Sequence, residues 1–441
     1  METRAGDPGA FAHFDLGRVD SPAFVVDAAR LRANLAILAD IRDRAGIKVL
    51  AALKAFSMWS TAPMIGEYLD GTCASGLWEA RLAGEFYDGE ISTYCAAYKP
   101  EDLSEILRLS DHVIFNSPQQ IVRCGAIIAA ARDGGDTFDI GLRINPLHPT
   151  GEVPQYDPCA PHSRLGFPID QLTPEHFDLI DGLHLHTLCE QDFEPLRDTW
   201  DAAFDTLEPF FGQFKWINLG GGHHITRSDY QRDELVQFLL DLKDDTGADV
   251  YLEPGEAVAL DAGILVGTVL DLKDDTGAEV YLEPGEAVAL DAGILVGTLL
   301  DLGDNGMPVA ITDISATCHM PDVIEAPYRP AMLGEIPREG GDLMGGSANP
   351  PEAPAFAGEQ GTVRLGGPSC LAGDVIGDYR FATGPRVGQR FAFLDQAHYS
   401  MVKTTTFNGV PLPSIWLWDS DTDSLECIKR FSYEDFRDRL S

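Results

Sequence analysis

The chain has 441 residues, of which 44% are hydrophobic, and a formal net charge of −38 from 32 basic and 70 acidic residues. Such a length can bury more than one core, and so acidic a surface repels nucleic acid and anionic membranes while attracting cationic ligands. No apolar run reaches the roughly 18 residues of a membrane span, so no membrane association is expected. Eight cysteines without CxxC spacing favour a reduced, cytoplasmic protein, and the acidic, lysine-poor composition suits a high-salt cytoplasm.

The first predicted elements alternate between strand and helix. A strand at 23–27 precedes a helix over 28–45, whose apolar positions recur at helical spacing. Eight short, mostly apolar segments then predict strands at 48–55, 71–76, 92–98, 112–116, 139–145, 180–186, 215–222 and 250–255. Helical patterns between them include 77–86, 118–132, 193–214 and 230–242. Eight parallel strands joined by helices close a barrel, so the predicted fold of 28–256 is α/β, a (β/α)8 TIM-type barrel.

The character of the sequence changes after residue 300. Alternating segments at 308–314, 390–394 and 414–418, separated by turn residues, predict a second, β-rich domain of sandwich or barrel-like form. We assign to it residues 257–441 together with 1–27. Within it, residues 334–362 are rich in Gly, Pro, Ala and Glu and predict a mobile insertion, and 432–440 predicts a last helix.

A tandem repeat lies at the predicted domain boundary. Residues 241–270 recur as 271–300 with two differences, Asp249 against Glu279 and Val269 against Leu299. Two copies do not build a solenoid, so their near-identity indicates a recent duplication. A barrel closed by eight strands has room for one of the two Tyr-Leu-Glu-Pro-Gly-Glu segments.

Polar residues stand near the carboxyl ends of four predicted strands, where barrel enzymes place their chemistry. Lys54, partly desolvated, could be a nucleophile or form a Schiff base, although a lysine there also fits a surface side chain that reaches water. The ring of His186 could stack on a planar cofactor. The glycines of Asn218-Leu-Gly-Gly-Gly222 leave backbone N–H groups for a phosphate, and a buried Glu253 needs a cation such as a protonated pyridine nitrogen. These are the parts with which a barrel holds pyridoxal phosphate.

Seven motifs, each weak alone, together make the chain resemble one family. They lie at 52–55, 184–191, 220–223, 253–257, 315–322, 367–374 and 407–409. With them the chain resembles the alanine-racemase-fold decarboxylases that use pyridoxal 5'-phosphate, and most of all the members that act on carboxynorspermidine and carboxyspermidine. The resemblance runs from about residue 20 to the end, apart from the 334–362 insertion and one repeat copy.

The resemblance implies a role for each matching residue. Lys54 would hold the cofactor as a Schiff base, His186 would stack on its ring, and Glu253 would pair with the pyridinium nitrogen. The other residues implied are Gly221, Gly222, Gly255 and Tyr399 for the cofactor, Cys370 for catalysis near the substrate Cα, and Asp374 and Glu256 for the substrate. The cysteine would be donated by the partner subunit, so the resemblance implies a homodimer with shared active sites.

The implied activity is that of a pyridoxal phosphate-dependent carboxy-lyase of polyamine biosynthesis. It would convert carboxynorspermidine or carboxyspermidine to norspermidine or spermidine. In the ornithine enzymes an Asp directly follows the cysteine, whereas here Leu371 follows Cys370, which argues against ornithine and fits a longer substrate. Those enzymes also have Arg where Glu256 stands, so phosphate binding must be arranged differently here.

Several alternatives stay open. The motifs also fit a decarboxylase of another basic amino acid, of the diaminopimelate, ornithine or arginine type, or a non-catalytic pyridoxal phosphate binder. His184 and His186 could form the metal pair of a hydrolase. Such hydrolases carry the pair on the first strand, and we expect strand alternation to send the two rings opposite ways, so we predict no metal site and expect His184 to pack. Arg143 and Asn145, which end the 139–145 strand, remain candidates for supporting contacts.

The duplication leaves two candidates for the cofactor glutamate. Glu253 and Gly255 belong to the first copy, and Glu283 and Gly285 are their duplicates. The first copy follows directly from the predicted helix at 230–242, which fixes the length of the crossover. We therefore predict Glu253 and Gly255 as the cofactor residues.

Overall fold

The computed structural model forms two compact units, and each is described by itself. One comprises Ala33–Val258 and Ala262–Val288, and the other comprises Met1–Arg32, Ala259–Asp261 and Ala289–Ser441. The structure describes residues 9–151, 157–161, 163–189, 191–223, 225–227, 229–252, 281–282, 289, 292–304, 307–325, 327–335, 362–369, 371–381 and 383–440.

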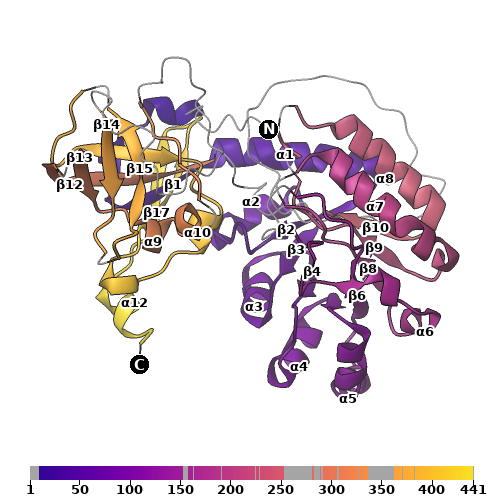
Figure 1. The fold of residues 1–441 in the computed structure, drawn as a ribbon. Helices are drawn as coiled ribbons and strands as arrows, with labels where there is room; N and C mark the ends of the chain where they lie inside the picture. Colours follow the sequence, from indigo (N-terminus) through magenta and orange to yellow (C-terminus); the bar gives the residue numbers. More distant parts are fainter. Residues whose placement is uncertain are drawn as a thin grey trace. The chain divides into compact units, whose positions relative to one another are not determined.

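Parallel strands of the first unit close into a ring (Figure 1). The ring contains β2 (Lys48–Ala52), β3 (Gly71–Ala74), β4 (Glu90–Tyr94), β5 (His112–Phe115), β6 (Asp139–Asn145), β8 (Gly182–His184), β9 (Trp216–Asn218) and β10 (Asp249–Leu252). Each strand pairs with the next in this order, and β10 also pairs with β2. Outside this order, β7 (Phe167–Pro168) pairs with β6, and β11 (Tyr281–Leu282) pairs with Lys48 and Val49 of β2, the same two residues with which β10 pairs. The predicted (β/α)8 barrel is confirmed.

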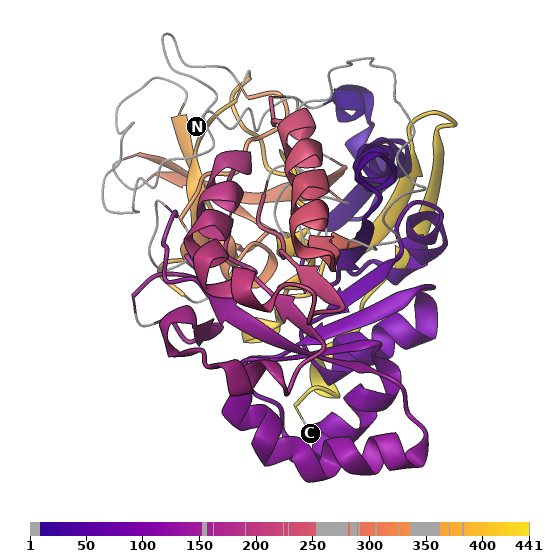
Figure 2. The same cartoon turned by 90° about the vertical axis from the view of Figure 1, so that its right-hand side faces the viewer.

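Helices lie outside this ring of strands (Figures 1 and 2). They are α2 (Ala62–Gly66), α3 (Leu77–Phe86), α4 (Pro100–Leu109), α5 (Pro118–Gly134), α6 (Pro174–Phe177), α7 (Phe193–Leu207) and α8 (Arg232–Thr246), while α1 (Ala28–Ala45) leads from one unit into the other. Local signals set their ends. The Ser117 side chain accepts a hydrogen bond from the Gln120 N–H at the start of α5, and Gly135 at φ 97° ends it.

One helix prediction was too long. The predicted helix over 193–214 ends at Leu207 in α7 and continues as the short 3-10 helix Glu208–Phe210. Pro209 explains the break, because it has no N–H for the helical ladder and its ring would clash with the carbonyl four residues earlier. Other 3-10 helices of the described chain are Gly9–His13, Leu16–Arg18, Trp59–Thr61, Ile169–Gln171 and Phe407–Gly409.

The barrel interior is filled at its centre by an indole ring. Trp216 of β9 is 1% exposed and forms a core cluster with Leu50 of β2 and Ile114 of β5. Glycines on β8, the strand beside β9, and on β6, the next strand along, make room for this ring. A Cβ on Gly182 would lie 2.1 Å from the Trp216 ring, and one on Gly141 would lie 2.5 Å from it. Because Trp216 is the first residue of β9, its ring fills the barrel toward the amino ends of the strands, away from the carboxyl ends where barrel enzymes bind their ligands.

The second unit is a mostly antiparallel sheet. Its strands are β1 (Ala23–Asp27), β12 (Gly293–Asp304), β13 (Pro308–Thr312), β14 (Thr362–Gly366), β15 (Val375–Arg380), β16 (Arg390–Leu394), β17 (Ser414–Asp419) and β18 (Ser424–Lys429). Their order is β15-β14-β13-β12-β1-β17-β18, with β16 paired to β12. Short helices follow some of the strands, namely α9 (Ala316–His319), α10 (Asp322–Glu325), α11 (Tyr399–Val402) and α12 (Tyr433–Arg437). The predicted β-rich second domain is confirmed.

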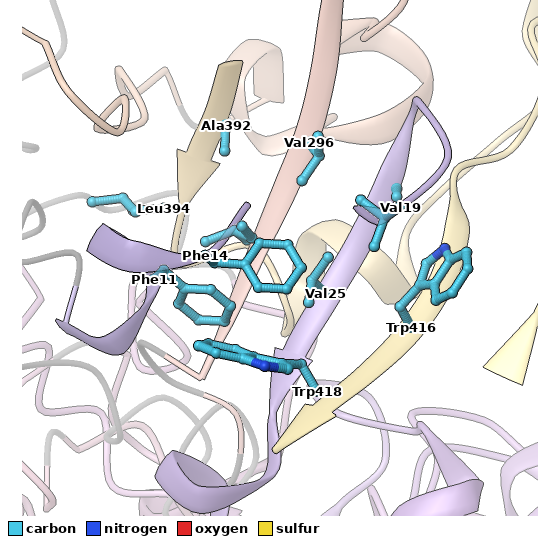
Figure 3. Close-up of a cluster of buried hydrophobic side chains, with 11 residues drawn as sticks. Phe11, Phe14, Val19, Val25, Val296, Ala392, Leu394, Trp416 and Trp418 are labelled. Carbon is cyan, nitrogen blue, oxygen red and sulfur yellow. The ribbon is translucent and has the colours of Figure 1, made fainter. Parts of the chain in front are cut away.

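Aromatic rings form one core of this unit (Figure 3). Phe11 and Phe14 lie 5.3 and 4.8 Å from Trp418, measured between ring centroids, and Val25 of β1 and Val296 of β12 complete the contact. The residues before β1 thus pack on the sheet formed by the C-terminal half of the chain. Most of the predicted insertion, residues 336–361, lies outside the described residues. No helix in the described ranges is long and apolar enough to cross a membrane.

Candidate active site

Lys54 lies just beyond the end of β2. The strand stops at Ala52, three residues short of the predicted segment, because the chain turns there: Ala55 and Phe56 both donate their N–H groups to the Ala52 carbonyl, at 3.1 and 3.2 Å. The side chain of Lys54 is half-buried, and both neighbours, Leu53 and Ala55, are fully buried. Its amine has no hydrogen-bond or ion-pair partner among the described residues, whereas Lys48 at the other end of β2 is paired with Glu90.

The sheet order places the predicted cofactor residues on four consecutive strands, β8, β9, β10 and β2. His186 comes two residues after β8, Gly221 and Gly222 follow β9, and Lys54 follows β2. The glutamate candidates come directly after β10 and β11. These two candidates lie outside the described residues, as do Gly255, Gly285, Glu256 and Cys370, so their assignments stay predictions.

His186 is held from two sides. The Gly221 N–H donates to its Nδ1 at 3.2 Å, so the neutral ring carries its proton on Nε2. The guanidinium of Arg143 donates from Nη2 to the His186 carbonyl oxygen at 2.7 Å. Next to it, the Leu185 N–H donates to the Asn218 carbonyl at 2.7 Å, which joins the ends of β8 and β9. The ring is therefore fixed before any ligand arrives.

The predicted orientation of the two histidines was wrong. The ring centroids of His184 and His186 lie 6.0 Å apart rather than on opposite sides. Residues two apart on a strand share a face, so alternation brings these rings together. His184 is 1% exposed and also lies 5.5 Å from the Tyr94 ring, as expected for a packed residue. No cluster of three or more metal-binding side chains occurs within the described ranges.

The glycine turn after β9 leaves no room for side chains. Gly220 has φ +70° and Gly222 has φ +90°, a region that favours glycine. A Cβ on Gly220 would lie 2.5 Å from the Cα of His186, and one on Gly222 would lie 2.1 Å from the Leu188 carbonyl oxygen. The buried Gly222 N–H has no acceptor in the described part of the chain. Such a turn, with backbone N–H groups beside a fixed imidazole, fits the phosphate of pyridoxal phosphate.

The loop that carries this turn is anchored behind it. Arg232, at the start of α8, donates to the carbonyl oxygens of Ile225, Thr226 and Arg227 at 2.7 to 2.9 Å. Tyr230 is buried and its hydroxyl lies 2.7 Å from Nδ1 of His223. Burial also raises the pKa of Tyr230 well above its usual value, so its hydroxyl stays protonated. These hydrogen bonds hold the segment that follows the glycine turn in place.

Two more predicted site residues belong to the second unit. Asp374 is 4% exposed, and its carboxylate accepts from the Ser315 hydroxyl at 2.8 Å and from the backbone N–H groups of Thr317 and Ser369 at 3.2 Å each. These contacts tie together the motifs at 315–322 and 367–374, and the predicted contact of Asp374 with a substrate amine stays a prediction. Tyr399, the first residue of α11, is half-buried.

Sequence reasoning missed two polar residues at strand ends. Tyr94 ends β4, and its hydroxyl donates to Oδ1 of Asn116, the residue after β5, at 2.6 Å. Asn116 also accepts from the Gly166 N–H at 2.7 Å and donates to the Arg164 carbonyl at 3.0 Å. A signal was present for Asn116, which ends the predicted 112–116 strand, but not for Tyr94, which lies inside the predicted 92–98 strand and becomes a strand end only because β4 stops there. The partners of Asn116 come from a loop 48 and 50 positions away that no local pattern connects to it.

Comparison with known proteins adds a second line of observation. No protein-family model matches the chain. It is 35% identical over 422 residues to the carboxynorspermidine/carboxyspermidine decarboxylase of Campylobacter jejuni, covering 95% of this chain and 98% of that protein. It is also 35% identical over 426 residues to the carboxyaminopropylagmatine decarboxylase of Synechocystis sp., covering 96% of each.

The solved structures that this fold resembles include decarboxylases as well. Carboxynorspermidine decarboxylase from Campylobacter jejuni, in complex with norspermidine, matches with a TM-score of 0.76 at 33% identity, covering 96% of this chain and 100% of that one. Diaminopimelate decarboxylase from Helicobacter pylori, in complex with L-lysine, matches with a TM-score of 0.72 at 15% identity over 96% of this chain and 97% of that one. The second likeness shows the fold alone.

Proposed function

The chain belongs to the family of the carboxynorspermidine/carboxyspermidine decarboxylases, and from this premise we propose that it removes carbon dioxide from carboxynorspermidine or carboxyspermidine with the help of pyridoxal phosphate. One observation carries the proposal. The predicted lysine, imidazole and glycine turn stand at the ends of strands β2, β8 and β9, which adjoin one another through β10. That arrangement gives one cofactor a nucleophilic amine, a flat ring and a phosphate site together.

Each candidate site residue has a separate proposed role. Lys54, whose amine is unpaired within the described chain, would attach the cofactor, and the Gly222 N–H would hold its phosphate. The fixed ring of His186 offers a flat surface, and Glu253 is the residue proposed to keep the pyridine nitrogen protonated. When bound, pyridoxal phosphate supplies an electron sink for the pair of electrons that departing carbon dioxide leaves behind. Cys370 is the proposed proton donor near the substrate Cα.

A longer, cationic substrate suits this chain. The position after Cys370 is Leu371, so the Asp that serves ornithine is missing, and the net charge of −38 favours the approach of a polyamine. The equal identity to a carboxyaminopropylagmatine decarboxylase supports a second candidate, in which the distal amine is replaced by a guanidinium. Diaminopimelate, ornithine and arginine are the remaining alternatives.

The proposal is tested by measuring carbon dioxide release from carboxynorspermidine, carboxyspermidine and carboxyaminopropylagmatine in parallel. The highest kcat/KM should belong to one of the first two. A clear preference for the guanidino compound would move the assignment to the second candidate, and release from none of them would overturn the proposed function. Release from diaminopimelate, ornithine or arginine alone would select one of the amino acid decarboxylases.

A variant pair tests the role of the lysine. Lys54→Ala should lose covalent attachment of pyridoxal phosphate, detected by borohydride reduction and mass spectrometry, together with nearly all turnover. Lys48→Ala is the matched control, because Lys48 opens the same strand at its other end and is paired with Glu90. It should retain attachment of the cofactor at Lys54. Cofactor trapped in the Lys54→Ala protein would show that another residue attaches it.

The setting of the enzyme is also part of the proposal. The homodimer with shared sites follows from the predicted role of Cys370, and the cytoplasmic location follows from cysteine usage. The seven cysteines that the structure describes are all free thiols, which is compatible with that setting. Salt adaptation rests on the excess of acidic over basic residues, 70 against 32.

A further inference from the structure

Arg143 is a buried arginine of the barrel unit without a carboxylate partner in the described chain. It lies on β6 and is 5% exposed. A guanidinium taken out of water is costly unless hydrogen bonds or another charge offset the loss of solvent. No Asp or Glu of the described residues forms an ion pair with it. Contacts other than a salt bridge must therefore offset the cost of burying the Arg143 guanidinium.

The contacts of Arg143 point to one neighbour. Its Nη2 donates to the carbonyl oxygen of His186 at 2.7 Å, and its guanidinium lies 4.6 Å from the centroid of the Tyr94 ring. Tyr94 is in turn held by its hydroxyl bond to Asn116. The arginine is thus fixed against an aromatic face and directs one N–H at the backbone of the residue whose ring is predicted to face the cofactor.

The opposite side of His186 is held by the glycine turn. The Gly221 N–H bonds to the ring Nδ1, and Gly220 packs so closely that a Cβ there would lie 2.7 Å from the Cβ of His186. The Gly221 bond restrains the tilt of the ring, and the Arg143 bond restrains the position of the backbone that carries it. Removing the arginine would leave the Gly221 bond to the ring but take away the Arg143 restraint on the backbone that carries the ring.

We propose that Arg143 is a positioning residue, which holds the His186 imidazole in place through the His186 carbonyl so that the ring meets the cofactor in a fixed orientation. This inference rests on the proposed function, because it takes pyridoxal phosphate as the group that His186 faces. It adds a residue of β6 to a site otherwise built from the ends of β8, β9, β10 and β2. A planar guanidinium suits the task better than an ammonium, since it stacks on Tyr94 while it donates.

The test is a double-mutant cycle on the affinity for pyridoxal phosphate, with Arg143→Gln, His186→Ala and the double variant. If Arg143 acts through His186, Arg143→Gln should weaken binding by about tenfold in the original protein. It should weaken binding by less than about twofold in the His186→Ala background, where no ring remains to be positioned. Circular dichroism in the absorption band of the bound cofactor should change in Arg143→Gln, because it reports the orientation of the ring.

Two further variants separate positioning from folding. Arg132→Gln is the matched control, because Arg132 also lies over an aromatic ring, Phe138 at 5.2 Å, but is exposed at the end of α5. It should bind the cofactor as the original protein does. Arg143→Lys keeps a charged donor and should bind more tightly than Arg143→Gln, which shows that a folded protein responds to the loss of the bond. The urea midpoint of each cofactor-free variant monitors folding.

The inference is overturned if Arg143→Gln binds as tightly as the original protein, or if its effect is equally large in the His186→Ala background. It is also overturned if Arg143→Lys binds as weakly as Arg143→Gln while both fold. Failure of the proposed function gives a different result, because then the original protein itself binds no pyridoxal phosphate. The cycle thus distinguishes an error about Arg143 from an error about the cofactor.

Discussion

Acidification from about pH 7.5 to about pH 5 should destabilise the protein through His319, a residue of α9 that is 0% exposed. Both ring nitrogens are engaged, since Nδ1 accepts from the Ser315 N–H at 3.2 Å and Nε2 lies 3.0 Å from the Pro411 carbonyl oxygen. Burial lowers the pKa of His319 to about 4, although the Pro411 carbonyl and the Asp374 carboxylate oppose that shift. The native ring is therefore neutral, with its proton on Nε2.

The sign of the effect follows from proton binding in the two states. An unfolded histidine titrates near pH 6.5, so below that pH the unfolded chain binds a proton at this residue. The native ring binds the proton only when the pH falls to about 4. The stability that His319 contributes is complete above about pH 6.5 and is lost as the pH falls between the two pKa values. With one pKa unit worth about 1.36 kcal/mol, the loss is about 2 kcal/mol at pH 5 and about 3 kcal/mol at pH 4.

The assay is urea unfolding at both pH values, followed by far-ultraviolet circular dichroism at matched salt and cofactor saturation. His319→Gln is the matched variant, because a Gln amide can accept from Ser315 and donate to Pro411 but takes up no proton. Between the two pH values, the original protein should lose about 2 kcal/mol more stability than the variant. Equal pH dependence in both proteins would refute the reasoning, because it would mean that the native ring is solvated or already charged.

Three further predictions concern the site. Gly222→Ala should weaken binding of pyridoxal phosphate and cost about 1–3 kcal/mol of stability, because the added Cβ would clash with the Leu188 carbonyl. Gly212→Ala is the control, because Gly212 also has a positive φ, +82°, but has open space around it, and this variant should bind the cofactor normally. Asp374→Asn should cost about 2 kcal/mol in urea unfolding, since its NH2 would face N–H donors; unchanged stability with a raised KM would instead support the predicted substrate contact. Mixing inactive Lys54→Ala and Cys370→Ala chains should restore part of the activity if subunits share sites, and no recovery after verified subunit exchange would count against sharing.

The fold was predictable because buried parallel strands have a strong local signature. Segments such as 112–116 and 139–145 are short, apolar and bounded by polar residues, and they became β5 and β6 with ends changed by at most one residue. Other ends were less accurate. The predicted segment 180–186 pairs only over Gly182–His184 as β8, and its last bond to β9 runs from the Leu185 N–H to the Asn218 carbonyl oxygen.

For the candidate site, the sequence could predict which residues stand at the strand ends but not which contacts they make. Lys54, His186 and the glycine turn could be found because each follows an apolar strand. The link from Arg143 to His186 joins residues 43 positions apart, and it depends on the register between β6 and β8, which one sequence does not reveal. Two of the three hydrogen bonds to the buried Asp374 could not be predicted either, because their donors, Ser315 and Thr317, lie 59 and 57 positions away in the sequence.

The two repeat copies pair with the same partners in the barrel. Tyr251 and Leu252 of β10 pair with Lys48 and Val49 of β2, and Tyr281 and Leu282 of β11 pair with the same two residues in the same register. One edge of β2 accepts one strand at a time, so the copies exclude each other. β10 is also paired with β9, which closes the ring from both sides, whereas β11 pairs with β2 alone among the barrel strands.

Connection lengths give a magnitude for this competition. With β10 in the ring, 2 residues separate it from α8 and 40 separate it from β12; with β11 in the ring, the corresponding numbers are 34 and 10. If lengths alone counted, loop-closure entropy would favour the first copy by about 1.3 kcal/mol, which corresponds to a ratio of about ten to one. On this estimate we expect the second copy to occupy the same edge in a minor fraction of molecules, because Tyr281 and Leu282 repeat Tyr251 and Leu252 of the first copy.

The glutamate that follows each strand tests this competition. Glu283→Gln should retain most of the activity, Glu253→Gln should retain about a tenth, and the double variant should retain none. Deleting residues 271–300 leaves one copy and should preserve full activity, which makes it the control for the length of the chain. If only Glu283→Gln is inactive, the second copy supplies the barrel strand and the choice of Glu253 is wrong. If Glu253→Gln retains no activity while Glu283→Gln retains all of it, the first copy holds the edge of β2 permanently and the two copies do not exchange.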